Sequence, residues 1–370
     1  MQVPDSEDLI ENKAWVQSEV SRHLRLKISE LGSATMKKRR VYLDVNYWTD
    51  LADAMDGKPR HPDYLCLLSM LEDFVSSGST ICVVGDDTLL ELFKRKDLSK
   101  RLLLARTMDC LSGGTMIQYC FERAELEVFE FIRENEKAAP CSPPAHLVWR
   151  KPCSFLGDIF PIPGPEISRQ DAAAQSKAFL DYFWELSFER MVGTLRNSLS
   201  LPNWKGTADS VNDANTERQA EIGNFDDLFL REVAGVLDII SLDIAHRRVR
   251  DDVAGTTTVS DALEAFQPAK ARVLAAYRRR ATGTALPYVD IHAGVHSAIR
   301  RDKQRRLKPN DFHDFGHAAA ALPYCSDFLT DGPLKALLCS RPLNFDQRYS
   351  CRVASSLSEA LDLFNSCPTR

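Results

Sequence analysis

The stretch that decides the fold is short: residues 41–44 read Val-Tyr-Leu-Asp, an apolar run that ends in a carboxylate. Similar apolar runs occur at 81–84 and 327–330, and segments with helical periodicity lie between the runs. Strands that alternate with helices predict a parallel sheet covered by helices. The carboxyl ends of parallel strands meet at one edge of such a sheet, where these folds bind ligands. We therefore expect an α/β fold with a site at the edge marked by Asp44.

Further carboxylates follow the other predicted strands. Glu91 lies early in the helix expected after 81–84, with Asp86 and Asp87 as its capping residues. An alanine-rich helix is expected at 310–321, and two aspartates open it. A cluster of oxygen ligands suits Mg²⁺ or Mn²⁺, which serve phosphodiester cleavage. The predicted catalytic residues are Asp44, Glu91, Asp311, Asp314 and Asp331, and the predicted metal ligands are Asp44, Glu91, Asp314 and Asp331; Asp311 is explained equally well as a helix cap.

Composition places the chain among globular proteins. It has 370 residues, of which 44% are hydrophobic and 27% charged. The formal net charge of −5 gives no general attraction for nucleic acid, so any basic binding surface must be local. The ten cysteines are scattered without a Cys-x-x-Cys pair, and we find no signal peptide or membrane-length apolar run. We expect a cytoplasmic protein with reduced thiols and no membrane partner.

The helical and strand patterns divide the chain into four parts. The strand signal stops after about residue 120 and returns after 285, and neither stretch alone holds enough strands for a sheet. We therefore expect the two stretches to share one sheet, with the strand at 327–330 beside the strand at 41–45. A separate helical domain is the alternative interpretation of the middle part. The four parts are an N-terminal helix and basic linker (1–40), the first half of the α/β domain (41–120), a mostly helical insertion with a proline-rich stretch at 139–166 (121–284), and the second half (285–370).

The order of these elements resembles the PIN-domain nuclease family. That family opens with a strand that ends in Asp, which is Asp44 here, and its second acid is a Glu early in a later helix, which is Glu91 here. Its third acid opens an alanine-rich helix, and a Thr closes the next strand. Asp314 and Thr330 fit that arrangement.

The resemblance covers roughly 41–120 and 285–366 and carries expectations for both fold and function. It implies a PIN-like, three-layer α/β/α fold with a parallel central sheet, and metal-dependent cleavage of single-stranded RNA. The family often carries a fourth acid two residues after the Thr, where this chain has Gly332. Asp331 is displaced by one position, and Asp327 is the other candidate.

Two alternative functions remain open. Because the fourth acid is displaced, the chain could be a catalytically inactive PIN-like module that binds RNA or a protein, or forms a homo-oligomer, with a protein partner held by the insertion. The histidines offer the other alternative, since His292 and His296, like His313 and His317, are spaced to share one helix face. The segment 312–317, Phe-His-Asp-Phe-Gly-His, also resembles the His-Asp dyad of HD-type phosphohydrolases, an all-helical family that the strand at 327–330 argues against.

A basic segment precedes the alanine-rich helix. Residues 300–308 hold six arginines and lysines, most of them at the end of a helix expected over 289–306. Its place beside the acids predicts contacts with substrate phosphates. A solvated helix end is the alternative. The predicted substrate-binding residues are Arg301, Arg305, Arg306 and His313.

Overall fold

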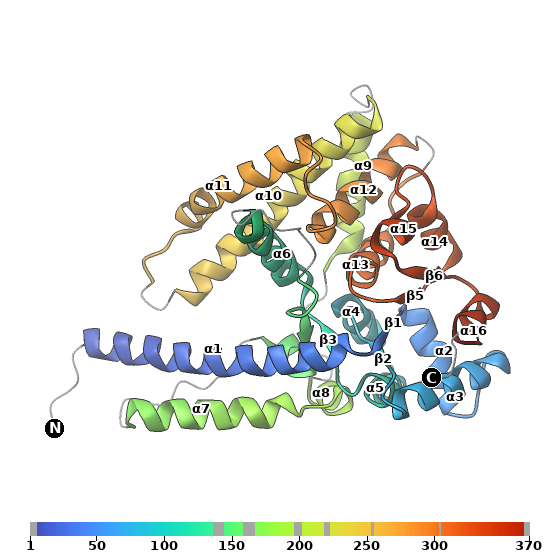
Figure 1. Ribbon diagram of the computed structural model, residues 1–370, viewed down its shortest axis with the longest axis horizontal. Coiled ribbons are helices and arrows are strands. Elements are labelled where there is room, and N and C mark those ends of the chain that lie inside the picture. The colour runs from blue at the N-terminus through green and yellow to red at the C-terminus, as the bar shows by residue number, and fades with distance from the viewer. Residues whose placement is uncertain are drawn as a thin grey trace.

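The structure is a computed structural model that describes residues 6–135, 144–157, 167–195, 202–217, 223–252, 255–302 and 305–365. Most of these residues are helical, and a small parallel sheet lies among the helices toward the right of Figure 1. Much of the proline-rich stretch at 139–166 and Lys303 of the basic segment lie outside the described residues. None of the described helices combines the length and the apolar character that a bilayer span requires.

The central sheet has four parallel strands in the order β2-β1-β5-β6. In the register of its middle pair, Val41 lies opposite Asp327 and Leu43 opposite Leu329. The predicted pairing of these two strands, nearly 290 residues apart, is therefore confirmed, and residues from both sides of the long helical stretch share one sheet. The strands are β1 (Arg39–Leu43), β2 (Thr80–Val83), β5 (Asp327–Leu329) and β6 (Arg352–Ala354).

Helices cover both faces of the sheet, because alternate residues of every strand are buried on opposite sides. Tyr42 and Phe328 belong to one core cluster, whereas Leu43 and Leu329 belong to the other. This double burial explains why the strands are continuous apolar runs. Helices α2 (Val45–Met55), α3 (Asp63–Ser76), α5 (Leu98–Ser112), α8 (Phe188–Leu195) and α16 (Leu357–Asn365) pack on the second face, and α6 (Cys120–Asn135), α10 (Phe225–Asp251), α12 (Pro287–Arg301) and α13 (Asp311–Ala321) contribute to the core of the first.

The segment 121–284 is mostly helical where it is described, and its helices pack in different places. Helix α10 packs against α6, α12 and α11 (Val259–Arg278), and α11 also packs against α6, so these helices extend the core of the first sheet face. By contrast, α7 (Arg169–Trp184) lies along the N-terminal helix α1 (Ser6–Met36), as Figure 1 shows. One short strand interrupts the helices: β4 (Trp149–Arg150) pairs antiparallel with β3 (Met116–Ile117). The remaining elements are α4 (Asp86–Lys94), the 3-10 helix η1 (Pro152–Leu156), α9 (Trp204–Glu217), α14 (Gly332–Cys339) and α15 (Phe345–Tyr349).

Candidate metal site at the carboxyl edge of the sheet

Asp44 is fixed at the junction of β1 and α2. Its Oδ1 accepts a hydrogen bond from the Asn46 backbone N–H (3.2 Å), so the carboxylate caps α2. Its Oδ2 accepts from the hydroxyl of Thr330 (3.1 Å), which directly follows β5. The carboxylate is buried and tied to the carboxyl ends of both central strands, as the strand pattern predicted.

Glu91 and His317 meet Asp44 from two further helices. Glu91 on α4 and His317 on α13 are joined by a hydrogen bond of 2.9 Å between Oε2 and Nε2. Asp44, Glu91 and His317 each offer one ligand atom, and these atoms lie within 4.8 Å of one another, so the group could hold a metal ion. The predicted pair of acids is therefore brought together, but the third member of the group is a histidine that the predicted ligand set did not include.

Asp314 lies beside this group, one helical turn before His317. Asn310 Nδ2 donates to its Oδ1 (3.3 Å). Burial, together with the charges of Asp44 and Asp331 and against the opposing effect of His317, raises the pKa of Asp314 to about 7. Its carboxyl group is thus proton-labile near neutral pH.

Asp331 and Asp311, the other two predicted acids, each accept a hydrogen bond from a backbone N–H. Asp331 caps α14 through an acceptor bond from the Leu334 N–H (2.8 Å). Asp311 accepts from the Lys308 N–H (2.8 Å) and lies 4.0 Å from Arg305. Both carboxylates influence the pKa of Asp314, but neither belongs to the group of three that could hold an ion. Asp331 is thus a helix cap, whereas Asp311 lies inside the first turn of α13, after the cap residue Asn310, and holds the preceding backbone.

Asp327 is excluded as the fourth acid. It begins β5, so it lies at the amino end of the strand, away from Thr330. Its buried carboxylate accepts from Arg39 Nε (2.7 Å) and forms an ion pair with Arg352 (2.5 Å). Asp327 is therefore part of a structural ion pair that joins β1, β5 and β6.

His313 does not face the substrate side, which corrects its predicted phosphate contact. The residue is fully buried, and its Nδ1 bonds Asp87 Oδ1 at 2.8 Å. Lys94 Nζ contacts Nε2, and the ring of Trp204 packs edge-on against the imidazole. Because the side chain has no exposed surface and both ring nitrogens already have partners, His313 cannot bind a phosphate.

The capping interpretation of Asp86 and Asp87 is also wrong. Gly85 occupies the cap position of α4, and both aspartates are buried inside the first turn. Asp87 pairs with His313, while Asp86 accepts from the Cys120 backbone N–H (2.9 Å). These aspartates tie α4 to α13 and α6.

Two glycines make the close contacts around α4 sterically possible. A Cβ at Gly316 would lie 1.8 Å from Asp87 Oδ2, and a Cβ at Gly85 would lie 2.0 Å from the Tyr42 hydroxyl oxygen. That hydroxyl hydrogen-bonds His317 Nδ1 (2.8 Å). Any larger residue at either position would displace a member of the acid–histidine network. The glycine between the two histidines of His-Asp-Phe-Gly-His (313–317) was the signal in the sequence for this contact.

Among Asp44, Glu91 and His317, only His317 can carry a positive charge. Burial raises the pKa of Asp44, and Glu91 adds to that effect. Burial also opposes ionisation of Glu91, but His317 and its neighbours outweigh it and lower the Glu91 pKa. For His317, burial opposes protonation, yet Tyr42, Glu91 and Asp44 together raise its pKa well above the ordinary value. Without a cation, one imidazolium compensates the neighbouring carboxylates.

The donor set fits a divalent cation after one proton is lost. In the present hydrogen bond, His317 Nε2 carries a proton toward Glu91, so the nitrogen is not free to bind an ion. If that proton leaves, Nδ1–H can donate to the Tyr42 oxygen, and Nε2 becomes a ligand oriented by an outer partner. Two carboxylates and one imidazole are acceptable to Mn²⁺ and softer than Mg²⁺ prefers.

An open groove of about 700 Å³ leads to this edge of the sheet. Thr330 and Asp331 form one side of it, and Asn46 lies beside the α2 cap. Arg60 reaches the opposite side, where it pairs with Asp50 at 3.1 Å. Asp44, Glu91 and His317 do not line the groove; Thr330, which binds Asp44, is the residue that connects the groove to them.

The predicted arginines occupy three different settings. Helix α12 ends at Arg301, earlier than the sequence suggested, and the Arg301 guanidinium lies over the Phe225 ring at 5.9 Å. Arg305 lies near Asp311, which connects it to the start of α13. Exposed Arg306 lies 3.8 Å from exposed Asp213, a pair of little energetic value. Only Arg305 has a direct link to the acidic helix.

The remaining histidine pair does not join the site. His292 and His296 on α12 are partly buried, with ring centroids 6.5 Å apart. Burial, reinforced by His296, lowers the pKa of His292 to about 3. His296 packs edge-on against Phe315, on the side of α13 that faces the core. An HD-type centre would need more of these groups in one place.

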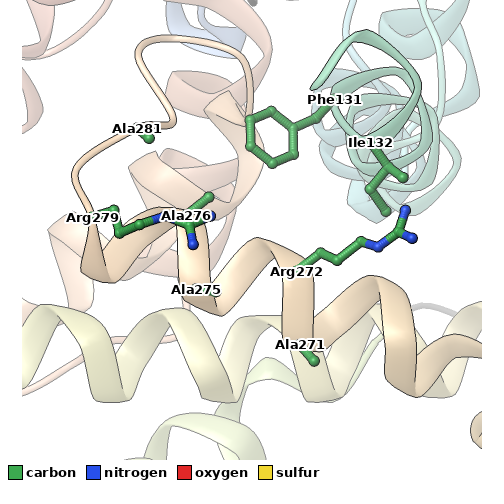
Figure 2. Close-up of a pocket in the computed structure, with 8 residues that line it drawn as sticks. All are labelled: Phe131, Ile132, Ala271, Arg272, Ala275, Ala276, Arg279 and Ala281. Atoms are coloured by element: carbon green, nitrogen blue, oxygen red, sulfur yellow. The ribbon is translucent and has the colours of Figure 1, made fainter. Parts of the chain in front are cut away.

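A second cavity lies away from the acids, between α6 and α11. Figure 2 shows Phe131 and Ile132 on one side, and Arg272 and Arg279 among alanines on the other. Its volume is about 580 Å³. Its lining residues include neither a carboxylate nor a histidine, so it lacks the groups for metal or acid–base chemistry.

Comparison of the chain with protein families, with curated proteins and with solved structures finds no match. The geometry of the site itself is therefore the basis for any functional conclusion.

Proposed function

We propose that this protein is a PIN-like, divalent-metal-dependent endoribonuclease that acts on single-stranded RNA. The observation that carries the proposal is the convergence of Asp44, Glu91 and His317, with Asp314 alongside, at the carboxyl edge of a parallel sheet. These residues come from segments far apart in the sequence, and folding has placed like charges together. Such an arrangement costs stability unless a cation is bound, and it is typical of functional sites.

The residues have distinct roles in this proposal. Asp44 and Glu91 would hold Mn²⁺ or Mg²⁺ directly, and Asp314 would do so once it has lost its proton. The bound ion would activate a water molecule and stabilise charge on the scissile phosphate. Thr330 and the α2 backbone fix the Asp44 carboxylate, and Tyr42 orients His317. The RNA would approach through the groove beside Asp331.

A non-catalytic module is the second candidate, and one contact favours it. The hydrogen bond from His317 to Glu91 already compensates one carboxylate without any metal. A site neutralised in this way could serve only to hold α4 and α13 together while another surface, such as the inserted helices, binds RNA, a protein or a second copy of the chain.

Cleavage of labelled single-stranded RNA separates the two candidates. We expect cleavage with millimolar Mn²⁺ or Mg²⁺, no cleavage in EDTA, and a loss of about 100-fold or more in Asp44→Asn. Asp109→Asn is the matched control, because Asp109 caps α8 on the other face of the sheet and an Asn retains an acceptor. Calorimetry with Mn²⁺ should show binding to wild type and Asp109→Asn and weak binding to Asp44→Asn. Mn²⁺ binding without cleavage, or cleavage that Asp44→Asn leaves unchanged, would contradict the proposal.

A further inference from the structure

An amphipathic cavity of about 620 Å³ lies between the first turn of α10, the end of α11 and the segment 342–348. Phe225 and Phe229 of α10 stack with ring centroids 6.1 Å apart, and Tyr277 packs edge-on against Phe229 at 5.8 Å. Phe345 adds a further aromatic surface. The cavity shares no lining residue with the acidic group at the sheet edge. Its volume is in the range of small-molecule sites.

Asp290 of α12 lines this cavity and has an unused acceptor. The residue is 2% exposed, and its Oδ2 accepts from the Tyr349 hydroxyl (2.7 Å) and pairs with Arg348 (3.1 Å). Its Oδ1 is buried and finds no hydrogen-bond partner among the described residues. Buried acceptors are nearly always satisfied, and leaving one unpaired costs about 1–3 kcal/mol. A ligand with an N–H or O–H donor would satisfy it once the carboxylate turns toward the cavity that Asp290 lines.

The charged residues around the aromatic walls favour an anion. Three arginines and two aspartates line the cavity, which leaves a formal excess of one positive charge. Arg348 is engaged with Asp290, and Arg280 pairs with Asp226 at 2.6 Å. Arg278 is exposed and makes no polar side-chain contact within the described part of the chain. Its guanidinium is therefore available to an anionic group of a ligand.

We propose that this cavity binds a nucleotide, with the base against the aromatic walls, a base N–H donating to Asp290 Oδ1, and a phosphate near Arg278. The three chemical requirements are a planar ring, a donor at its inner end and an anionic group at its outer end. A nucleoside monophosphate combines all three. The site stands apart from the acidic group, so this inference does not depend on the proposed nuclease activity.

Calorimetric titration of the full chain with AMP tests the proposal directly. We expect saturable 1:1 binding, weakened about tenfold when the donor is removed, as in purine riboside 5′-monophosphate, and about tenfold when the phosphate is removed, as in adenosine. Arg278→Gln should weaken AMP binding about tenfold. The matched control is Arg106→Gln, an exposed arginine on the other face of the sheet. Asp290→Asn, checked by circular dichroism for folding, should weaken AMP and leave purine riboside 5′-monophosphate unchanged.

Three outcomes would overturn the assignment. The first is the absence of saturable AMP binding by the folded wild-type protein. The second is equal AMP affinity in Arg278→Gln and Arg106→Gln. The third is loss of AMP binding in Asp44→Asn but not in Arg278→Gln, because that result would move the nucleotide to the acidic edge of the sheet. Retention of AMP binding by a nuclease-inactive Asp44→Asn protein would support the cavity as an independent site.

Discussion

The two ends of the central strands treat buried aspartates in opposite ways. At the amino end of β5, Asp327 is enclosed by Arg39 and Arg352, so a buried negative charge meets two positive charges. At the carboxyl end, Asp44 has neighbours of the same charge and only one histidine that opposes them. Two equally buried aspartates therefore have different roles. An acid paired with two arginines holds strands together, whereas acids that share one histidine form a group that could hold a cation.

Matched Asp→Asn substitutions at the two ends of the strands should give the largest difference in the free energy of unfolding. Asp327→Asn leaves two arginines without their carboxylate and should cost about 3 kcal/mol of unfolding free energy. Asp44→Asn should change it by only about 0.5 kcal/mol, since Asn is also a good helix cap and the Thr330 hydroxyl can turn to accept from the amide. Urea unfolding of both variants without divalent ions measures the difference. Equal destabilisation would mean that Asp44 is as structural as Asp327.

The pH dependence of metal binding tests whether Asp314 belongs to the metal site at the carboxyl edge of the sheet. Asp314, with a pKa of about 7 in the folded protein, must lose its proton before it can hold an ion. Because binding also removes the His317 proton, we expect Mn²⁺ affinity to fall about 100-fold per pH unit below 7 in the wild type and about tenfold per unit in Asp314→Asn. Calorimetry at several pH values gives both slopes. Identical slopes would remove Asp314 from the metal site.

In the metal-free protein, the Asp314 carboxyl group should lower the free energy of unfolding as the pH rises. Its folded pKa is raised, so the unfolded chain ionises first as the pH rises, and Asp314 lowers stability progressively between about pH 4 and pH 7. Asp314→Asn should therefore be more stable than wild type at pH 8, and the difference should disappear below about pH 4. Added Mn²⁺ should reverse the order at pH 8 by stabilising only the wild type.

The two acid–histidine pairs between α4 and α13 allow a comparison within the site. His317 contacts Glu91 in the group of three, whereas His313 is enclosed with Asp87 and Lys94. We expect His317→Gln to lower Mn²⁺ affinity about tenfold. His313→Gln should leave Mn²⁺ affinity unchanged but cost about 1–2 kcal/mol of stability through lost buried hydrogen bonds. Calorimetry and urea unfolding of both variants test this. The reverse assignment would place the ion between Asp87 and His313.

The smallest expected effect concerns the basic segment. Charge reversal of Arg301, Arg305 and Arg306 should weaken RNA binding while leaving Mn²⁺ binding unchanged, because a net-acidic protein attracts phosphate through local basic residues. Each lost phosphate contact should reduce the salt slope of binding by about 0.7. Titrations at several salt concentrations measure the slope, with reversal of Arg22 and Arg25 on α1 as the control. An unchanged slope would identify the segment as a solvated helix end.

The sequence by itself determined the elements and the edge on which the acids lie. The apolar runs specified the strands, because strands buried on both faces must be continuously hydrophobic. Asp44, Glu91 and Asp314 then followed from their positions after those runs, and the long-range pairing of β1 with β5 followed from the scarcity of strands in each half. These inferences succeeded because local pattern and chain topology are sufficient for them.

Only the tertiary structure decided which polar residues compensate one another. Asp327 and Asp331 are both acids next to the same strand, and their roles separate only when Arg39 and Arg352 are seen around the first. His313 and His317 are one turn apart on one helix, yet only His317 reaches the acidic group. Such partners come from distant segments. A periodic pattern predicts on which face of a helix or strand a residue lies, but it does not predict which other element packs against that face. The physical reason is that charge compensation depends on distances of a few ångströms, which the packing of α4 against α13 sets through Gly316.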